Sequence, residues 1–377
     1  MIPYGRQHID AEDIQAVVEV LQSDWLTTGP KVGEFERAFA DVVDAKYAVA
    51  VNSGTAALHA AMYALGIGPG DEVIVPAMTF AATANCVVFQ GGTPVFADVD
   101  SETLLIEPSS VEDRISPKTK AIIAVDYAGQ PCDYDTLAAI AKKHNLALVA
   151  DACHSLGARY KDRPVGSLVR LSAFSFHPVK HITTGEGGMI TTDDPKLAEK
   201  MPLFRSHGIT TDHRQREAQG SWFYEMVDLG YNYRITDFQC ALGLSQLKKL
   251  PKWIARRREI AHRYDEAFQN IPRVNPLSVQ SETFHAYHLY VIRLDLDGTD
   301  LNRSVVFSKL REAGIGVNVH YIPVYLHPFY RNRLDTHPGL CPIAERAYER
   351  IISLPMYPTL SHGDQCHVIE TLDKILS

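Results

Sequence analysis

Short apolar runs alternate with segments of helical periodicity through the first two-thirds of the chain. We expect β-strands at Tyr47–Asn52, Glu72–Pro76, Thr93–Asp98, Ala121–Tyr127, Leu146–Asp151 and Leu171–Phe176. Helical patterns lie between several of these runs, as at Thr55–Leu65 and Tyr134–His144. Such alternation predicts βαβ units, and therefore a mostly parallel sheet with helices on both faces, an α/β/α arrangement.

The pattern changes near Leu250 and Pro251, where a long charged helix is predicted over Lys252–Phe268. This helix carries three consecutive arginines at 256–258, which we interpret as a solvated face. Beyond it we expect a strand, a helix and a second strand, at His288–Leu296, Arg303–Ala313 and Gly316–Tyr321. We therefore predict a large domain over residues 1–250 and a smaller α+β domain over residues 251–377. The polar segment Thr210–Gly220 is expected to form a mobile surface loop.

The composition is that of an ordinary globular enzyme. With 46% hydrophobic and 22% charged residues among 377, the chain is not disordered as a whole. Its net charge of −8 argues against a nucleic-acid partner. No apolar stretch is long enough to span a membrane or resembles a secretory signal, so we expect no membrane partner and a cytoplasmic location. Six scattered cysteines without a CxxC pair predict free thiols and no metal site.

The most informative segment is Phe174–Gly188, in which a strand leads into a loop that carries Lys180. Proline, histidine and aromatic neighbours suggest that this lysine is partly buried. Burial disfavours the ammonium form and lowers the pKa, which leaves a nucleophilic amine of the kind that forms a Schiff base. The alternative is a surface lysine beside a glycine-rich turn.

A carboxylate ends the apolar strand that precedes the lysine loop. Asp151 lies at the C-terminal end of the Leu146–Asp151 run, where an α/β sheet presents side chains to a ligand crevice. Pyridoxal phosphate (PLP) needs such a carboxylate beside its pyridine nitrogen. His154, three residues on, could reach the ring or its phenolic oxygen. The alternatives are a helix N-cap for Asp151 and a hydrogen-bonded core residue for His154.

A third element is the strand, small-residue turn and helix start at Val51–Leu58. Free N–H groups at a helix N-terminus bind phosphate, and Ser53, Thr55 and Ser175 could add hydroxyl donors. An ordinary N-cap is the alternative for the serine. Phe80 could stack on a flat ring or simply pack in the core. Gly66–Gly70 is expected to be a helix C-cap, and neither a P-loop nor a GxSxG motif occurs.

Taken in order, several motifs resemble the PLP-dependent nucleotide-sugar aminotransferases of the DegT/StrS family. The resemblance covers essentially the whole chain and is carried by Asn52–Leu58, Gly68–Ile74, Asp151–Gly157, Ser175–Lys180, Gly185–Gly188 and Gly230–Arg234. It implies a fold-type-I transferase with a large PLP domain and a small C-terminal domain. The opening Ile2–Tyr4 and the stretches Ser23–Pro30, His177–Glu186 and Gly314–Val324 are most similar to members that act in pseudaminic acid biosynthesis.

The resemblance also implies roles for individual residues. Lys180 would form the Schiff base with PLP and move protons, and Asp151 would pair with the pyridinium nitrogen. His154 would lie beside the ring, and Gly54, Thr55 and Ser175 would hold the phosphate. Asn232 would bind the phosphate of the PLP held by the neighbouring subunit, which implies a homodimer with shared active sites. The nucleotide sugar would contact Tyr4, Asp24, Trp25, Leu26, Thr27, His320, Tyr321, Ile322 and Pro323, although loop or turn structure also explains each of these residues.

The implied reaction moves the amino group of L-glutamate to C4 of a UDP-4-keto-6-deoxy-N-acetyl hexose. Its product would be UDP-4-amino-4,6-dideoxy-N-acetyl-β-L-altrosamine. Two alternatives stay open, namely an aminotransferase that forms a UDP-4-amino-4-deoxy-arabinose and a non-catalytic PLP-binding regulator. A dehydratase is disfavoured because the related dehydratases carry histidine in place of Lys180. We expect a locally electropositive pocket built from backbone N–H groups, Lys180 and arginines such as Arg234.

Overall fold

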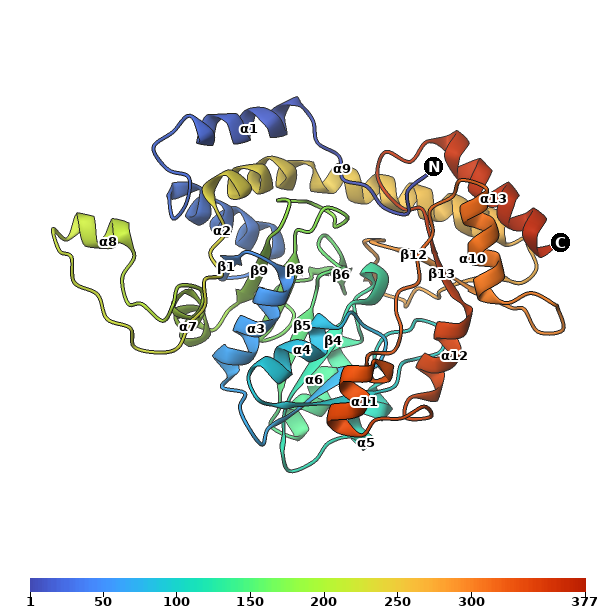
Figure 1. Cartoon of the computed structure of the whole chain (residues 1–377), viewed down its shortest axis with the longest axis horizontal. Helices are drawn as coiled ribbons and strands as arrows, with labels where there is room; N and C mark the ends of the chain where they lie inside the picture. The colour runs from blue at the N-terminus through green and yellow to red at the C-terminus, as the bar shows by residue number, and fades with distance from the viewer.

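A seven-stranded sheet forms the centre of the larger part of the protein in a computed structural model, which describes residues 1–377 (Figure 1). The strand order is β1-β9-β8-β5-β4-β2-β3, and only β9 runs against its neighbours. These strands are β1 Tyr47–Val51, β2 Glu72–Pro76, β3 Thr93–Ala97, β4 Thr119–Val125, β5 Ala147–Asp151, β8 Leu171–Ser175 and β9 Gly188–Thr192. The predicted mostly parallel sheet is therefore confirmed, and each of its six predicted strands is found within two residues of its expected bounds.

Burial along the strands shows why the sheet needs cover on both faces. All five residues of β9 and the last five of β4 are buried, so side chains on both sides of these strands are excluded from water. Helix α3 packs on β1, β5, β8 and β9, while α2 packs on β1 and α9. The helices of this part are α1 Ala11–Leu21, α2 Pro30–Val43, α3 Gly54–Leu65, α4 Ala82–Phe89, α5 Pro108–Asp113, α6 Tyr134–Lys143, α7 Pro195–Arg205, α8 His213–Ala218 and α9 Asp237–Phe268.

A smaller antiparallel sheet, β10-β12-β13, organises the C-terminal third. It has its own hydrophobic cluster, in which Ile260 and Tyr264 of α9 pack with Val368 and Leu372 of α13. The elements are β10 Val274–Pro276, β12 Tyr290–Leu294, β13 Ile351–Leu354, α10 Arg303–Glu312, α11 Pro328–Leu334, α12 Pro342–Arg350 and α13 His362–Leu376. A third small sheet joins β11 Thr283–Phe284 to β6 Arg159–Tyr160 and β7 Arg163–Pro164.

The expected strand at Gly316–Tyr321 is wrong. Only one isolated bridge, between Asn318 and Ser353, connects this segment to a sheet. The segment is instead held by contacts on several sides, including the backbone bond from Gly316 to the carbonyl of Ile2. Its apolar character reflects burial against neighbouring segments, because a run this short does not distinguish a strand from a buried irregular segment.

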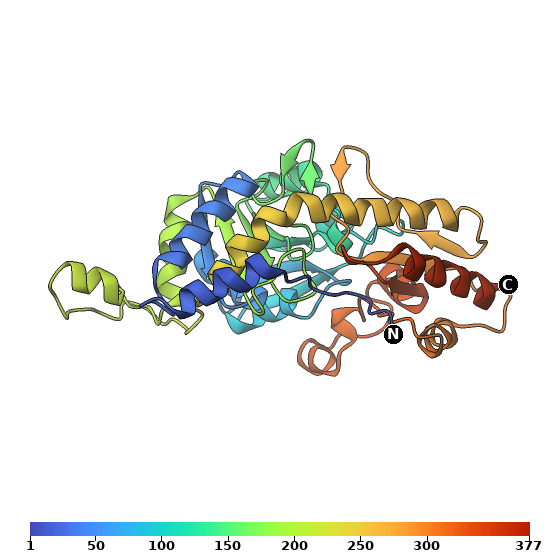
Figure 2. The ribbon, with the colours of Figure 1, turned by 90° about the horizontal axis from the view of Figure 1, so that it is seen from above.

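Helix α9 begins at Asp237, fifteen residues before the predicted start at Lys252, and passes through Pro251 without ending. A proline inside a helix removes one hydrogen bond, and here the packing of α9 on α1 and α2 supports the helix ahead of that position. Figures 1 and 2 show α9 running from the large sheet to the C-terminal part. The proposed boundary at residue 250 thus lies inside one continuous helix, and the two-domain division stays a prediction.

One of the three consecutive arginines of α9 does not lie on a solvated face. Arg257 is buried, and its guanidinium donates to the carbonyl oxygens of Tyr287, His288 and Met356 at 3.0, 3.3 and 3.1 Å. Arg256 and Arg258 on either side are partly exposed. The interpretation of the basic run as a solvated face is therefore wrong for its central member, which links α9 to two separate loops.

The polar segment Thr210–Gly220 contains the short helix α8, which is capped at its N-terminus by Asp212. Figure 2 shows this segment projecting away from the rest of the molecule. The segment does lie at the surface, but His213–Ala218 are helical rather than loop, because Asp212 and Gln215 complete a capping box that stabilises this short helix. Its mobility stays a prediction.

No helix, α9 included, combines the length and the apolar character that a membrane-spanning segment requires.

The buried Arg257 supplies a test of this architecture. We expect Arg257→Leu to destabilise the protein by about 3 kcal/mol or more, because three buried carbonyl groups lose a charged donor. Lys252→Leu, at an exposed position on the same helix, should change the stability by about 0.5 kcal/mol or less. Urea unfolding followed by circular dichroism measures both values. Equal effects of the two substitutions would contradict the role assigned to Arg257.

Candidate active site

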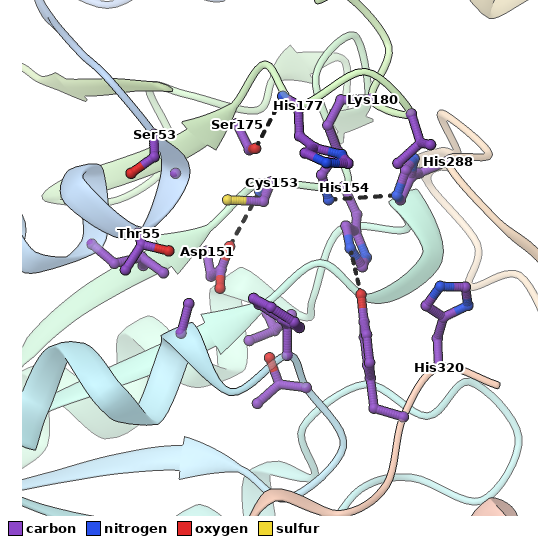
Figure 3. Close-up of a pocket in the computed structure, with 18 of the residues that line it drawn as sticks. Ser53, Thr55, Asp151, Cys153, His154, Ser175, His177, Lys180, His288 and His320 are labelled. Carbon is purple, nitrogen blue, oxygen red and sulfur yellow. Dashed lines mark hydrogen bonds between the residues drawn. The ribbon is translucent and has the colours of Figure 1, made fainter. Parts of the chain in front are cut away.

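A cavity of about 560 Å³ opens at the carboxyl ends of the parallel strands (Figure 3). Segments from both parts of the chain line it, from the start of α3 to the irregular segment before Tyr321. Eleven residues predicted for the site share this lining, namely Tyr4, Ser53, Gly54, Thr55, Phe80, Asp151, His154, Ser175, Lys180, His320 and Tyr321. Parallel strands end at one edge of a sheet, which is why residues so far apart in sequence meet here.

Lys180 lies in the loop that follows β8, where its backbone N–H donates to the carbonyl of His177 at 2.9 Å. Its side chain is partly buried, and its Nζ lies 3.5 Å from Nε2 of His288. Loss of water around the ammonium group lowers the pKa of Lys180, while the negative charge of Asp151 opposes this shift. Lys180 forms no ion pair within 4 Å, so it is not the ordinary surface lysine of the alternative reading.

Asp151 ends β5 and is 5% exposed. One carboxylate oxygen accepts a hydrogen bond from the hydroxyl of Thr83 at 2.7 Å, and the other accepts from the N–H of Cys153 at 3.3 Å. Thr83 is in turn bonded to Thr79 at 2.8 Å. The contact with Cys153 is the local turn bond that the alternative reading anticipated. The bond from Thr83 comes from α4 and fixes the carboxylate toward the cavity.

The ring of His154 is buried between Tyr321 and His288. Its Nε2 lies 3.1 Å from the hydroxyl of Tyr321, but its Nδ1 has no hydrogen-bond partner. Burial holds the pKa of His154 well below its ordinary value, with the charge of Lys180 adding to the effect, so the imidazole is neutral. His154 is therefore not a core histidine with hydrogen bonds at both ring nitrogens.

The start of α3 forms the opposite wall of the cavity. Ser53 is the N-cap, and its side chain accepts from the N–H of Ala56 at 3.0 Å. A Cβ at Gly54 would lie 2.8 Å from Cβ of Ser175, and a Cβ at Gly188 would lie 2.4 Å from the carbonyl oxygen of Ser53. Glycine at both positions therefore lets β8 and β9 approach the helix end, so that the helix N-terminus and the Ser175 hydroxyl lie at one site. A helix N-terminus with free N–H groups of this kind binds anions.

Phe80 is 58% exposed, so the core-packing alternative is wrong for this residue. Its ring lies 6.0 Å from the ring of Tyr321 across the cavity mouth. Tyr321 is held in turn by the bond between its N–H and Sδ of Met78 at 3.2 Å. An exposed aromatic face at the cavity mouth is available to a planar ligand.

Other predicted residues do not reach this cavity within one chain. Asp24, Trp25, Leu26, Thr27, Ile322, Pro323 and Asn232 are absent from its lining. Asn232 is exposed, and its carbonyl accepts from Nδ2 of Asn52 at 3.3 Å. Arg234 is also absent, and its guanidinium lies 3.5 Å from Oγ of Ser206. Lys180 is the only lysine or arginine in the lining, so the expected contribution of arginines is wrong for a single chain.

The sequence alone did not indicate several residues that line the cavity. His288 is the clearest of these, since it stands 108 residues from Lys180 and was interpreted as the start of a strand. The others include Cys153, His177, Val179, Glu186, Asn318 and Val319. The histidines in the segment before β12 were the only available signal, and no spacing linked them to the lysine.

The residues present fit PLP. The start of α3 with Thr55 and Ser175 offers N–H and hydroxyl donors to a phosphate, and Asp151 offers a fixed carboxylate. Buried Nδ1 atoms of His154 and His288 lack partners, which is expected where a polar ligand completes the hydrogen bonds. The amine of Lys180 completes the set of groups that the cofactor requires.

A buried carboxyl group, Asp126, lies directly behind this site. Its backbone N–H donates to the carbonyl of Asp151, and its side chain accepts from Ser155, Tyr134 and the N–H of Cys132 at 2.5, 2.7 and 3.0 Å. Burial raises the pKa of Asp126 to about 7, although these three donors act in the opposite direction.

Known proteins resemble this chain over nearly its whole length. The model of the DegT/DnrJ/EryC1/StrS aminotransferase family matches residues 7–373. The spore coat polysaccharide biosynthesis protein SpsC of Bacillus subtilis is 45% identical over 377 residues, covering 100% of this chain and 97% of SpsC.

Two solved structures show the same fold over their whole length. Spr1654 of Streptococcus pneumoniae, described as a sugar aminotransferase and solved in its PMP form, has a TM-score of 0.94 with 36% identity, covering 100% and 99% of the two chains. PseC of Helicobacter pylori, an aminotransferase of pseudaminic acid biosynthesis, has a TM-score of 0.93 with 35% identity and the same coverage.

The protonation of Asp126 makes the stability of the folded protein depend on pH. The folded carboxyl holds its proton up to about pH 7, whereas the unfolded one loses it near 3.8, so the wild type loses stability as the pH rises between these values. Asp126→Asn keeps the shape and cannot ionise. We expect the variant to gain up to about 4 kcal/mol relative to wild type between about pH 4 and pH 8. Urea midpoints measured across this range test the prediction.

The exposed Asp113→Asn is the control for this experiment, and its stability relative to wild type should not follow the same curve. A difference between wild type and Asp126→Asn that stays constant over pH would contradict the burial argument.

Proposed function

The chain belongs to the DegT/DnrJ/EryC1/StrS aminotransferase family, whose members use PLP, and on this basis we propose its reaction. The enzyme transfers the amino group of L-glutamate to C4 of a UDP-4-keto-6-deoxy-N-acetyl hexose. The product is UDP-4-amino-4,6-dideoxy-N-acetyl-β-L-altrosamine. One observation gives the main support for aminotransferase activity. The partly buried amine of Lys180 lies in one cavity with the Asp151 carboxylate and the start of α3.

Each part of the cavity has a role in this reaction. The N–H groups at the start of α3, with Gly54, Thr55 and Ser175, would hold the phosphate of PLP. Asp151 would pair with the pyridine nitrogen, and Thr83 fixes the carboxylate through its hydroxyl. When bound, PLP withdraws electrons from the carbon that exchanges its proton.

Lys180 would hold PLP through its side-chain amine, and the same amine would act as the general base and acid for the proton that moves. Its lowered pKa increases the fraction of neutral amine available to accept a proton. The neutral His154 would lie beside the cofactor ring, and its own position is held by the contact with the Tyr321 hydroxyl. Phe80 covers the exposed side of the cavity.

The relatives support a sugar substrate, and PseC supports the particular sugar that we propose. Tyr4, His320 and Tyr321 line the cavity and would contact this sugar, with the rings of Tyr4 and His320 5.6 Å apart. SpsC, with its higher identity of 45%, favours a second candidate, an amino sugar destined for another surface polysaccharide. A UDP-4-amino-4-deoxy-arabinose product is a further alternative.

We also propose a homodimer with shared active sites in the cytoplasm. Residues 221–231, next to α8, are almost entirely exposed and carry the apolar side chains Trp222, Phe223, Tyr224, Met226, Val227 and Leu229. An apolar segment of this kind marks a protein interface, and a second copy would bury it. Asn232, at its end, would then reach the partner's cofactor. The unpaired state of all six cysteines supports a reducing compartment.

The proposed substrate is tested by a coupled assay of the PLP-loaded protein with glutamate and a set of UDP-4-keto sugars, with NMR of the amino sugar formed. We expect the N-acetyl hexose to react with the highest kcat/KM. Lys180→Ala should lower turnover by at least about 10³-fold and abolish the Schiff-base absorbance, because the variant has no amine. Lys248→Ala, at an exposed position on α9, is the control.

Preferred turnover of a keto pentose, or of another keto hexose, would replace the proposed substrate and leave the family unchanged. PLP binding without turnover of any keto sugar would favour the regulatory alternative. Full activity of Lys180→Ala would contradict the mechanism itself.

Shared active sites predict complementation between two impaired variants. Lys180→Ala lacks the amine, and Asn232→Ala lacks the side chain that would bind the phosphate of the partner's PLP. After mixing and reassembly at limiting PLP, we expect about a quarter of wild-type activity, because half the dimers are mixed and each mixed dimer regains one intact site. Each variant incubated with itself is the control. Activity that stays at the level of the controls would show that Asn232 serves its own chain.

A further inference from the structure

His288 is a buried residue to which the proposed mechanism gives no role. It lies two residues before β12 and is 5% exposed. Its Nε2 is 3.5 Å from Nζ of Lys180, and this contact is the only hydrogen bond that the lysine side chain makes (Figure 3). The Nδ1 of His288 has no partner.

Two other buried histidines show what a fully hydrogen-bonded imidazole looks like in this protein. His59 bonds to the Tyr233 hydroxyl at 3.1 Å and to Nε2 of Gln90 at 2.8 Å. His320 bonds to Oγ of Ser353 at 2.8 Å and to Nδ2 of Asn318 at 3.3 Å. Both nitrogens are satisfied in each ring, whereas the ring of His288 forms a hydrogen bond only with the amine of Lys180. The position of this ring is therefore not explained by hydrogen bonds to the rest of the fold.

The backbone around His288 is fixed from two sides. Arg257 donates to the carbonyl oxygens of Tyr287 and His288, and the N–H of Leu289 bonds to the carbonyl of Ala128 at 3.1 Å. A Cβ at Gly129 would lie 2.8 Å from the backbone N of His288, so the two segments are in close contact. The ring is consequently held at a defined distance from the lysine loop.

We propose that His288 is a positioning residue for Lys180, whose free amine it holds through Nε2 during the part of the cycle in which the cofactor carries the amino group. This inference rests on the proposed role of Lys180. The acceptor atom on His288 keeps the amine inside the cavity and oriented toward the carbons between which the proton moves. Without it, the flexible lysine side chain would sample other rotamers after its release from the cofactor.

The charge state of the surroundings allows this contact. Burial, together with the nearby charge of Lys180, holds the pKa of His288 well below its ordinary value, so the imidazole is neutral and Nε2 can accept. The other titratable groups around the pair are Asp151, Cys153, His154, His181, Arg257 and His320. Burial also lowers the pKa values of the three histidines and raises the pKa of the Cys153 thiol, so these four groups are neutral and Asp151 is the carboxylate of the set.

The test uses the full chain loaded with pyridoxamine phosphate, in which the Lys180 amine is not bound to the cofactor. Acetylation of Lys180 by acetic anhydride is followed by peptide mass spectrometry over a range of pH, for wild type, His288→Leu and His288→Gln. His285→Leu is the matched control, because His285 is equally buried on the same loop but does not contact Lys180.

We expect His288→Leu to lower the midpoint of the labelling curve by about one pH unit, because the ammonium form loses its acceptor. His288→Gln should return toward wild type, since an amide oxygen can also accept. In steady-state assays, His288→Leu should reduce kcat about tenfold while KM for the keto sugar stays within about twofold. His285→Leu should leave the labelling midpoint where it is in wild type.

A folded His288→Leu protein whose labelling midpoint does not fall would overturn the inference. So would an equal shift in His285→Leu, or a shift that His288→Gln does not reduce, because either result indicates a general effect on the loop. Failure of the proposed function is a separate outcome, in which the wild type neither binds PLP at Lys180 nor transfers an amino group.

Discussion

The site depends on a lysine amine that is partly withdrawn from water without an ion-pair partner. Lys180 is surrounded by neutral imidazoles, of which His154, His181 and His288 are buried. A carboxylate in direct contact would hold the ammonium form and remove the nucleophile. The carboxylates that line the cavity, Asp151 and Glu186, form no ion pair with Lys180, and Asp151 accepts a hydrogen bond from Thr83 instead. Desolvation thus makes the amine reactive, and the arrangement of neutral groups preserves that effect.

The same cavity must accept anions, and the backbone supplies the means. Gly54 and Gly188 let α3, β8 and β9 approach so closely that a Cβ at either position would overlap a neighbour. The N–H groups at the start of α3 then lie beside the Ser175 hydroxyl at one edge of the sheet. This arrangement concentrates positive partial charge in a chain whose net charge is −8, without an arginine in the cavity.

The small sheet and α9 complete the site from the other side. Arg257, on the part of α9 that continues past Pro251, fixes the loop that carries His288. The segment Gly316–Tyr321 is bound to the N-terminal residues through Ile2, and it brings His320 and Tyr321 over the cavity. The cavity is therefore a property of the whole chain, although Asp151 ends a strand of the large sheet and Lys180 lies in the loop that follows another.

Local sequence patterns were enough to predict the parallel sheet and the part of the site that lies at the strand ends. Asp151, Ser175, Lys180 and the start of α3 follow directly from strands, because the carboxyl ends of parallel strands must meet at one edge. The contact of His288 with Lys180, the burial of Arg257 and the irregular path of Gly316–Tyr321 became visible only in three dimensions. These features arise from packing between segments that are far apart in sequence. Local periodicity records which residues avoid water, but it does not record which distant segment covers them.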